Sequence, residues 1–350
     1  GTIPGDSEIA QAAVRLGESL ILRTDVDAVL TWSTTANYPI TGPDNLNGLH
    51  YLGYLVEPAE PQQKAKASEL PSSEHLRYGY VASGHNGIDS GTASKSLQYA
   101  VIRYDGDQAA RTAAAELAGV FRTNLTEYRR ITGTVAGLSG GESVTAEGQS
   151  APIAAAFVPR GRDVLVVSAV SGDARWAADT VRTTVDRQTA SLPPADGLDD
   201  PLSGDEADLL ARTLPITTTQ DRRQLEDTVG GPQVRAHRYH DPARVLARYR
   251  AAGVDMIAER DTEVYRAADA ERARSLQQGF VQGYTATGST AAVAPRGLPT
   301  AVCTAAAGGA PDQAFTCSVV VDRYLAAADG RTLSQAQQKI SAQYLLLKEL

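Results

Sequence analysis

The feature that most constrains the fold of this chain is a pattern that occurs twice. Residues 102–118 read IRYDGDQAARTAAAELA, in which a strand ends in a turn that opens directly into a helix. Residues 237–253 repeat that order as HRYHDPARVLARYRAAG. A strand–helix unit buries the apolar side of each element by packing the two together. The repetition therefore predicts two similar domains in tandem.

The segments around each copy extend the repeat. In the first half, the pattern predicts strands at 75–84 and 97–106, a helix at 107–122, a hairpin at 151–172 and a helix capped by Asp173. In the second half, it predicts a strand at 233–241, a helix from Pro242, a strand pair at 254–267, a helix at 269–284, a cysteine hairpin and a closing helix from Leu333. The expected fold class is α+β, with two tandem similar domains. Each would be an antiparallel sheet with helices packed mainly on one face.

A polar segment separates the two halves. Residues 193–206 read PPADGLDDPLSGDE and contain proline, glycine and aspartate without an apolar period. We therefore predict an N-terminal α+β domain at 1–195, a linker at 196–206 and a C-terminal α+β domain with a disulfide hairpin at 207–350. The chain length of 350 residues agrees with two domains.

Charge and hydropathy exclude two classes of partner. The net charge of −8 argues against nucleic acid, because phosphate binding needs a basic face. No run approaches the ~20 apolar residues of a transmembrane helix. Direct insertion of the sequence into a membrane is therefore not expected.

The chain has two cysteines, Cys303 and Cys317, in the segment AVCTAAAGGAPDQAFTCSVVV. Two β-type runs flank a turn region here, and antiparallel pairing would place the cysteines nearly opposite one another, within disulfide reach. Two buried free thiols are the alternative. A disulfide would stabilise the fold by about 3 kcal/mol in the chain-entropy treatment. It would also imply an oxidising compartment.

Three segments carry a resemblance to a known family. They are AVRLGESLILRTDVDAVLT near the N-terminus, LQYAVIRYDGDQAARTAAAEL, and RTLSQAQQKISAQYLLLKEL after the cysteine hairpin. The chain resembles secreted lipoproteins of mycobacteria, nocardiae and rhodococci, which have two tandem α+β domains and no established function. The resemblance implies an extracytoplasmic location and a lipid anchor on the full-length precursor. The opening GTIPGDSE shows neither a signal peptide nor a lipidated cysteine, so the anchor is implied by resemblance alone.

The sequence offers few groups for catalysis. It has no G-x-S-x-G elbow between a strand and a helix, no P-loop and no Rossmann glycine spacing. Lys95 lies between Ser94 and Ser96, rather than three residues after a serine as in S-x-x-K. The resemblance brings no catalytic residues either. We therefore expect no catalytic residue and no cofactor.

The five histidines favour structural roles. His237 and His240 form an H-x-x-H that could hold a metal, but positions i and i+3 of a strand point to opposite faces. His50, His75 and His85 lie at strand ends or in loops, and could cluster only if those strands are neighbours. No metal site is expected.

Tyrosines of the first half give the candidate binding surface. On alternating strands, Tyr78 and Tyr80 share one face. A tyrosine ring offers a large amphipathic area with a hydrogen-bonding tip, which suits a glycan, lipid or protein contact. The candidate binding residues are Tyr51, Tyr54, Tyr78 and Tyr80, beside a polar loop at 58–74. The alternative is that these rings pack beneath the helices.

The expected function is a non-enzymatic binding or scaffold module of the cell envelope. Its partner would be a lipid, a glycan or an envelope protein, and the groove between the domains would be the default pocket. We expect a monomer that meets the membrane only through the lipid anchor. Two other classes stay open, an envelope hydrolase with an unrecognised active site and a purely structural protein-interaction domain. A nucleophile–base pair within hydrogen-bond reach would favour the hydrolase.

Overall fold

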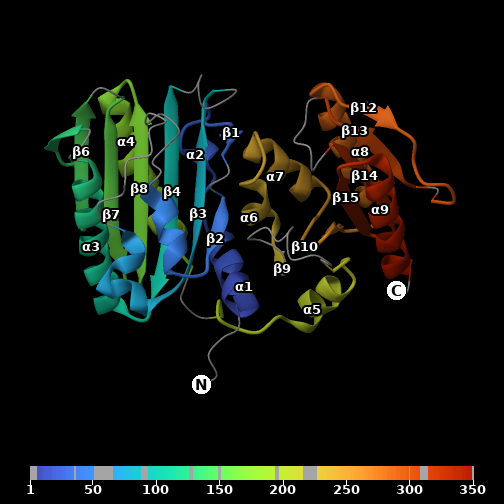
Figure 1. The fold of residues 1–350 in the computed structure, drawn as a ribbon, viewed down its shortest axis with the longest axis horizontal. Coiled ribbons are helices and arrows are strands. Elements are labelled where there is room, and N and C mark those ends of the chain that lie inside the picture. The colour runs from blue at the N-terminus through green and yellow to red at the C-terminus, as the bar shows by residue number, and fades with distance from the viewer. Residues whose placement is uncertain are drawn as a thin grey trace. The chain divides into compact units, whose positions relative to one another are not determined.

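The computed structural model describes residues 6–34, 37–50, 66–87, 94–125, 129–148, 151–193, 197–215, 227–298, 300–307 and 314–348. The chain forms two compact units (Figure 1). The first contains Gly1–Asp199 and also Ala236–Ala243, and the second contains Asp200–Arg235 and Arg244–Leu350. Residues 236–243 were predicted to belong to the C-terminal domain, but they fold with the first unit. None of the described helices is both long and apolar enough to cross a membrane.

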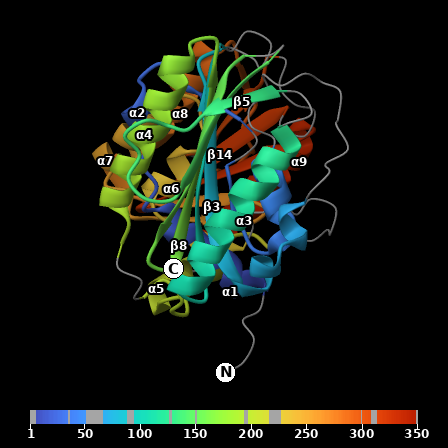
Figure 2. The same ribbon diagram turned by 90° about the vertical axis from the view of Figure 1, so that its left-hand side faces the viewer.

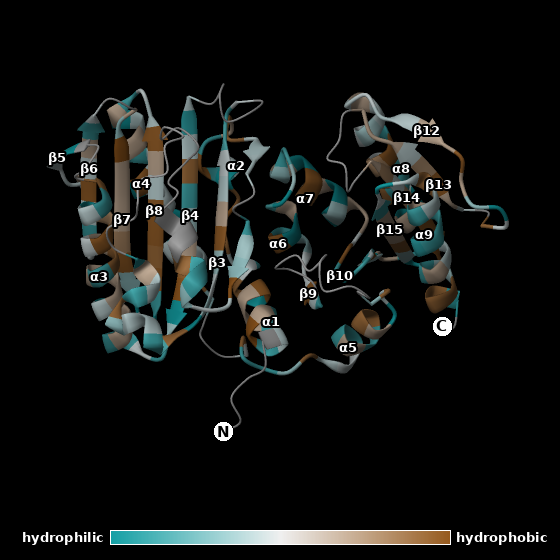
Figure 3. Ribbon diagram, in the orientation of Figure 1, coloured by the Kyte–Doolittle hydropathy of each residue, from teal (hydrophilic) through white to brown (hydrophobic). Residues whose placement is uncertain are grey.

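The first unit is built on one antiparallel sheet. Its strands are β1 (Trp32–Ser33), β2 (Tyr38–Ile40), β3 (Leu76–His85), β4 (Lys95–Tyr104), β5 (Arg129–Gly133), β6 (Glu142–Gly148), β7 (Ile153–Arg160) and β8 (Asp163–Ser171). They follow the order β1-β3-β4-β8-β7-β6-β5, and β2 also pairs with β3. Hydrophobic residues concentrate along the central strands β7 and β8 (Figure 3).

Helices cover both faces of the first sheet. The described helices are α1 (Asp6–Gly17), α2 (Arg23–Val26), α3 (Asp107–Leu125) and α4 (Ala174–Ser191), with 3-10 turns at Pro43–His50, Ala67–Glu69 and Pro71–His75. The helices α3 and α4 lie on opposite sides of the strands (Figure 2). On the α3 side, Phe121 packs in one apolar cluster with Ile102 and Val166. Asp173 caps α4 as predicted, accepting from the backbone N–H groups of Arg175 and Trp176.

The second unit has a second antiparallel sheet. Its strands are β9 (Thr228–Gly230), β10 (Met256–Glu259), β11 (Glu263–Arg266), β12 (Thr290–Ala292), β13 (Val302–Ala305), β14 (Phe315–Val321) and β15 (Tyr324–Gly330), in the order β12-β13-β14-β15-β11-β10-β9. Its helices are α5 (Gly204–Ala211), α6 (Pro232–Ala236), α7 (Pro242–Ala251), α8 (Ala270–Ala286) and α9 (Leu333–Lys348). The helix α6 ends at the first residue of the segment that folds with the first unit.

Neighbouring residues of β11 show that helices also cover both faces of this sheet. Tyr265 contacts the rings of Tyr249 in α7 and Phe280 in α8. Val264 points the other way and packs in a cluster with Ile340 of α9. The structure confirms the α+β class and the two antiparallel sheets. The helices, however, cover both faces of each sheet, because the central strands are apolar on both sides.

The predicted duplication is present, but in a different register. The order β3-β4-α3-β5-β6-β7-β8-α4 in the first unit matches β10-β11-α8-β12-β13-β14-β15-α9 in the second, and the two sheets have corresponding strand orders. The counterpart of the pattern at 102–118 is therefore the end of β11 with α8, rather than 237–253. Arg103 and Arg266 hold the same place, each four residues before the following helix begins at Asp107 or Ala270.

The predicted strand at 233–241 is wrong. Pro232 begins the short helix α6, where the fixed backbone angle of proline suits a first helical turn. Residues 237–241 then form turns, and Asp241 has a positive φ of 50°, before Pro242 begins α7. HRYHD and IRYDG are therefore similar in sequence but not in structure. Pro232 and Pro242 each begin a helix, and HRYHD connects the two helices.

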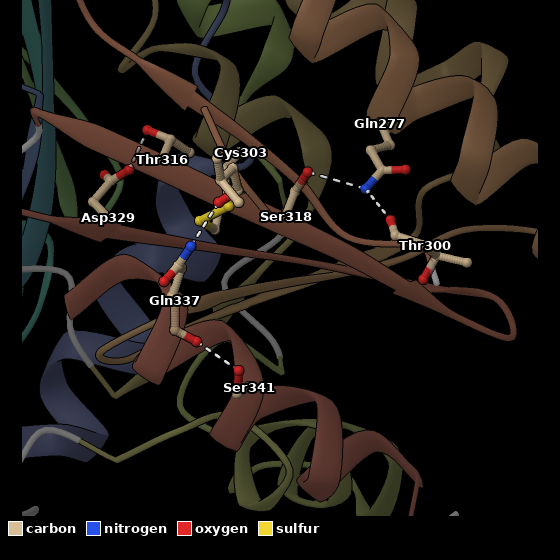
Figure 4. Close-up of a disulfide and its surroundings, with 10 residues drawn as sticks. Gln277, Thr300, Cys303, Thr316, Ser318, Asp329, Gln337 and Ser341 are labelled. Atoms are coloured by element: carbon tan, nitrogen blue, oxygen red, sulfur yellow. Dashed lines mark hydrogen bonds between the residues drawn. A yellow bond between two sulfur atoms is a disulfide. The ribbon is translucent and has the colours of Figure 1, made fainter. Parts of the chain in front are cut away.

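The cysteine hairpin of the second unit is confirmed. Cys303 of β13 lies directly opposite Cys317 of β14, and a disulfide joins them with a Cα–Cα distance of 4.1 Å (Figure 4). Both cysteines are buried beside the α9 cluster. On the other face of β14, the Gln277 amide of α8 donates to the Ser318 hydroxyl at 3.1 Å.

Removing this disulfide is expected to destabilise the second unit by about 3 kcal/mol, because the reduced chain gains loop entropy on unfolding. The measurement is urea unfolding of a Cys303→Ala/Cys317→Ala variant followed by circular dichroism. Both tryptophans, Trp32 and Trp176, lie in the first unit, so their fluorescence transition is the internal control and should not move. An unchanged circular-dichroism transition would contradict a structural role for the bond.

Candidate functional site

The tyrosines predicted as a binding surface do not form one. Tyr51 and Tyr54 lie outside the described residues. Tyr78 and Tyr80 are 2% and 0% exposed, because helices cover the sheet on the face to which they point. The Tyr78 hydroxyl accepts a hydrogen bond from Arg103 Nη1 at 3.4 Å. Buried rings cannot supply an accessible aromatic face, so this prediction is corrected for Tyr78 and Tyr80.

His237 lies on the same side of the first sheet as Tyr80. Its ring is fully buried, with centroids 6.5 Å from Tyr80 and 6.3 Å from Tyr99. Its Nε2 atom lies 3.4 Å from the carbonyl of Leu20, to which it donates. Burial, reinforced by the nearby positive charge of Arg23, lowers the pKa of His237 to about 3. His237 is therefore a neutral core residue and is not available to bind a metal.

Arg23 of α2 holds the segment that carries His237. Its guanidinium donates to the carbonyls of Leu30 at 2.9 Å, Thr31 at 3.0 Å, His237 at 3.0 Å and Tyr239 at 2.7 Å. The side chain is fully buried, and this burial lowers its pKa to about 10 against the opposing effects of Tyr99 and Asp241. Arg23 therefore joins residues 236–243 to the first unit through backbone acceptors.

A cluster of buried polar side chains lies on the opposite side of the same sheet. We call it the polar face, and it comprises Ser83, His85, Ser96, Gln98 and Ser168. Each member is between 4% and 6% exposed. Cross-strand pairing arranges them in two rows, since Ser83 is opposite Gln98, which is opposite Ser168, while His85 is opposite Ser96. The polar face continues the surface of β4 that carries Ala100 and Ile102 beneath α3.

The strand β1 extends both rows toward the edge of the sheet. Trp32 is directly opposite His85, so its ring is on the side of the polar face. The hydroxyl of Thr34 shares a hydrogen bond with that of Ser83. The Asn37 amide oxygen accepts from the backbone N–H of Ser83 at 3.0 Å. These bonds fix the edge of the polar face to β3.

Trp32 and His240 form the accessible rim of the polar face. Their ring centroids lie 4.2 Å apart, Trp32 is partly exposed and His240 is exposed. The backbone N–H of Ser33 donates to His240 Nδ1 at 3.0 Å, which requires that nitrogen to be unprotonated. Burial, Arg23 and His85 together lower the pKa of His240. The two histidines of the H-x-x-H pattern thus lie apart, although the segment is not the strand from which their opposite orientation was predicted.

One polar atom of this cluster lacks a protein partner. The amide oxygen Oε1 of Gln98 is buried and accepts no hydrogen bond within the described part of the chain. An unsatisfied buried carbonyl costs about 1–3 kcal/mol of stability. This acceptor, together with the buried polar side chains around it, makes the polar face the candidate functional site.

The second unit shows which part of the sheet the fold itself requires. The strands β3 and β4 have ten residues each, whereas their counterparts β10 and β11 have four each. The hairpin of the second unit therefore ends before the level at which Ser83, Ser96 and Gln98 lie. The positions of Ser83, Ser96 and Gln98 therefore have no counterpart in the hairpin of the second unit.

The polar face consists of uncharged hydrogen-bonding side chains. It supplies hydroxyls, an imidazole and an amide carbonyl, all of which are neutral or polar hydrogen-bonding groups. His85 of β3 lies directly opposite Ser96 of β4. A hydrolytic serine needs a base within hydrogen-bond reach and a group that orients the base. Among the described residues, no group of three or more His, Cys, Asp or Glu side chains is placed to hold a metal ion.

Comparison with protein families identifies both halves of the chain. The description "Domain of unknown function (DUF7373) N-terminal" matches residues 5–194, and "Domain of unknown function (DUF7373) C-terminal" matches residues 209–349. The chain belongs to the DUF7373 family. The expectation of a two-domain family without established function is confirmed at that level. The bacterial range and the lipid anchor of the resemblance stay predictions.

Comparisons with individual proteins add little to the DUF7373 assignment. The comparison with curated proteins gave no match. Among solved structures, the chain is similar to the extracellular domain of PknH from Mycobacterium tuberculosis, at 14% sequence identity. The similarity covers 51% of this chain and 96% of that chain, with a TM-score of 0.29. At this level of similarity, it gives no information about the site.

The spacing of polar residues in the sequence also indicates the polar face. Ser83 and His85 are two residues apart at the end of a strand, and Ser96 and Gln98 are two residues apart at the start of the next. Period-two polar pairs on adjacent strands share one face of a sheet. The predicted binding residues Tyr78 and Tyr80 point to the other face of the same strands, which helices cover.

Proposed function

We propose that this protein is an exported lipoprotein of the cell envelope that acts as a non-enzymatic binding module, with the polar face of the first unit as its binding site. The observation that carries the proposal is the buried, unpartnered Oε1 of Gln98 within a set of polar side chains that the duplicated fold does not require. Binding would satisfy this atom, whereas the ligand-free fold leaves it unpaired.

Two further observations support export and a binding role. A disulfide between Cys303 and Cys317 forms and persists in oxidising compartments, which for a bacterium lie outside the cytoplasm. The net charge of −8 argues against nucleic acid as the ligand. A lipid, a glycan and an envelope protein are the candidate partners.

Native mass spectrometry of the protein purified from the envelope of its own host tests the proposal. We expect a reproducible adduct mass that organic or aqueous extraction removes, because a ligand that satisfies Gln98 should survive purification. The control is the Gln98→Leu variant from the same host, which should carry no adduct. A bare polypeptide mass for both proteins would contradict a small-molecule binding module and favour a structural protein-interaction domain.

A further inference from the structure

Residues 236–243, which we call the inserted segment, connect α6 to α7 but fold with the first unit. Arg23 of α2 donates to two backbone carbonyls of this segment, those of His237 at 3.0 Å and Tyr239 at 2.7 Å. The other two acceptors of Arg23 follow α2 in the sequence, so it keeps those two hydrogen bonds if the inserted segment leaves. The segment can therefore detach without leaving the buried guanidinium wholly unsatisfied.

Protonation of His237 is strongly disfavoured while the inserted segment is attached. The ring is fully buried, and its Nδ1 atom has no hydrogen-bond partner among the described residues. Its Nε2 atom already donates to the Leu20 carbonyl. A proton on Nδ1 would therefore make a buried donor without an acceptor, beside the positive charge of Arg23. The rings of Tyr80 and Tyr99 also face His237, and phenols supply no counter-charge between pH 5 and 7.

His240 is also held in its neutral form. Its Nδ1 atom accepts from the backbone N–H of Ser33 at 3.0 Å, whereas an imidazolium carries a proton on that nitrogen. Arg23 of α2 and His85 of β3 are the titratable side chains that act on this ring, and both disfavour a positive charge there. The Trp32 ring, with its centroid 4.2 Å away, would favour the cation. Protonation would nevertheless set two N–H donors against each other at Ser33.

Asp241 adds a backbone strain that detachment can relieve. Its φ is 50°, in the left-handed region that a residue other than glycine adopts at a cost. Its N–H donates to the carbonyl of Thr31 at 2.6 Å, which ties this turn to the first unit. Its carboxylate acts on Arg23, which stays in the first unit. The attached conformation is therefore partly offset by strain, and this lowers the cost of releasing the segment.

We infer that the inserted segment is a pH-sensitive latch, which is attached to the first unit at neutral pH and detaches increasingly often as the pH falls toward 5. Both histidines are neutral in the attached state and take up a proton once released, so acid favours release. The pKa of His237, about 3 when attached against an ordinary 6.5, places its effect between these two values. The lowered pKa of His240 acts in the same direction. This inference does not depend on the proposed binding function.

Hydrogen exchange followed by mass spectrometry measures the release. The protection factors of backbone amides in 236–243 are compared at pH 7 and pH 5, with those of β4 and β8 as the reference for unfolding of the whole unit. We expect the protection of the segment to fall by at least about 20-fold between these pH values, because released His237 binds a proton. Carboxyl groups contribute little, since pH 5 lies above their ordinary pKa range.

The level of protection separates release from unfolding. The segment should be less protected than β4 and β8 at both pH values, because it opens locally. Protection equal to that of β4 and β8 would mean that the segment is released only when the unit unfolds, and would overturn the inference. Protection that is lower than in the strands but unchanged between pH 7 and pH 5 would overturn it as well.

Histidine variants identify the groups that respond to pH. The His237→Gln/His240→Gln double variant should show less than about a twofold change in segment protection between pH 7 and pH 5. The matched control is His75→Gln, since the His75 side chain is 57% exposed, and it should keep the full change. His240→Gln alone, at an exposed position that tolerates substitution, should reduce the change if the double variant does not fold. A 20-fold change that survives in these variants would refute the latch.

Discussion

Replacing Asp163 with asparagine is expected to destabilise the first unit by about 3–5 kcal/mol, because it leaves the buried charge of Arg103 without a counter-charge. The guanidinium of Arg103 donates to both carboxylate oxygens of Asp163, at 2.7 and 2.9 Å, across β4 and β8. The side chains of this pair are 1% and 6% exposed. The measurement is urea unfolding followed by tryptophan fluorescence, which reports only the first unit.

The second unit offers a matched control at the equivalent position of the repeat. Arg266 forms a similar two-bond contact with Asp255, at 2.8 and 2.9 Å, but the Asp255 side chain is 51% exposed. Water screens this pair, and Asp205 lies 3.1 Å from Arg266 as a second counter-charge, so Asp255→Asn should cost less than about 1 kcal/mol in the circular-dichroism transition. Equal losses for Asp163→Asn and Asp255→Asn would show that burial does not set the difference.

The stability of the first unit is expected to fall as the pH drops from 6.5 toward 3, because of His237. The folded pKa of about 3 lies below the unfolded value of 6.5, so over this interval the unfolded state takes up a proton that the folded state does not. The stability is therefore fully present above pH 6.5 and declines below it, by about 3–5 kcal/mol in total. Urea unfolding at a series of pH values, followed by tryptophan fluorescence, measures this slope.

A variant without the imidazole should lose this part of the dependence of the unfolding free energy on pH. His237→Gln is expected to be less stable at pH 7 and to show a weaker decline of unfolding free energy between pH 6.5 and 4. The control is Val181→Ala, which removes buried methyl groups from α4 on the same side of the sheet and adds no titrating group. Val181→Ala should lower the free energy of unfolding by a similar amount at every pH. A parallel shift for His237→Gln as well would refute the role assigned to His237.

Much of the fold was predictable because many of its elements follow from local sequence patterns. The alternation around Tyr78 and Tyr99 predicted β3 and β4, and the Ala-rich period predicted α3. The spacing of Cys303 and Cys317 predicted their pairing across a hairpin. The register of the repeat was not predictable from similar letters, because Pro232 and Pro242 make the second copy helical where the first is extended.

The candidate site was harder to predict because it depends on which strands become neighbours. The sequence gives no indication that β8 returns to lie beside β4, which places Ser168 next to Gln98. It also does not show that Trp32, more than fifty residues earlier, pairs with His85. The predicted binding surface was based on the aromatic residues Tyr78 and Tyr80, but both rings are buried in the core of the first unit. The spacing of the polar side chains on β3 and β4 predicts that they share a face, but it does not predict that this face is buried.

Residues 236–243 show that the boundary between the family matches differs from the boundary between the compact units. These residues lie inside the second family match, 209–349, but their folding partners are Arg23 and the core around Tyr80 and Tyr99 in the first unit. The boundary between the two family matches therefore differs from the boundary between the two compact units. Separating the chain between the two family matches would therefore remove the His237 and Tyr239 carbonyls from Arg23 and leave it only those of Leu30 and Thr31.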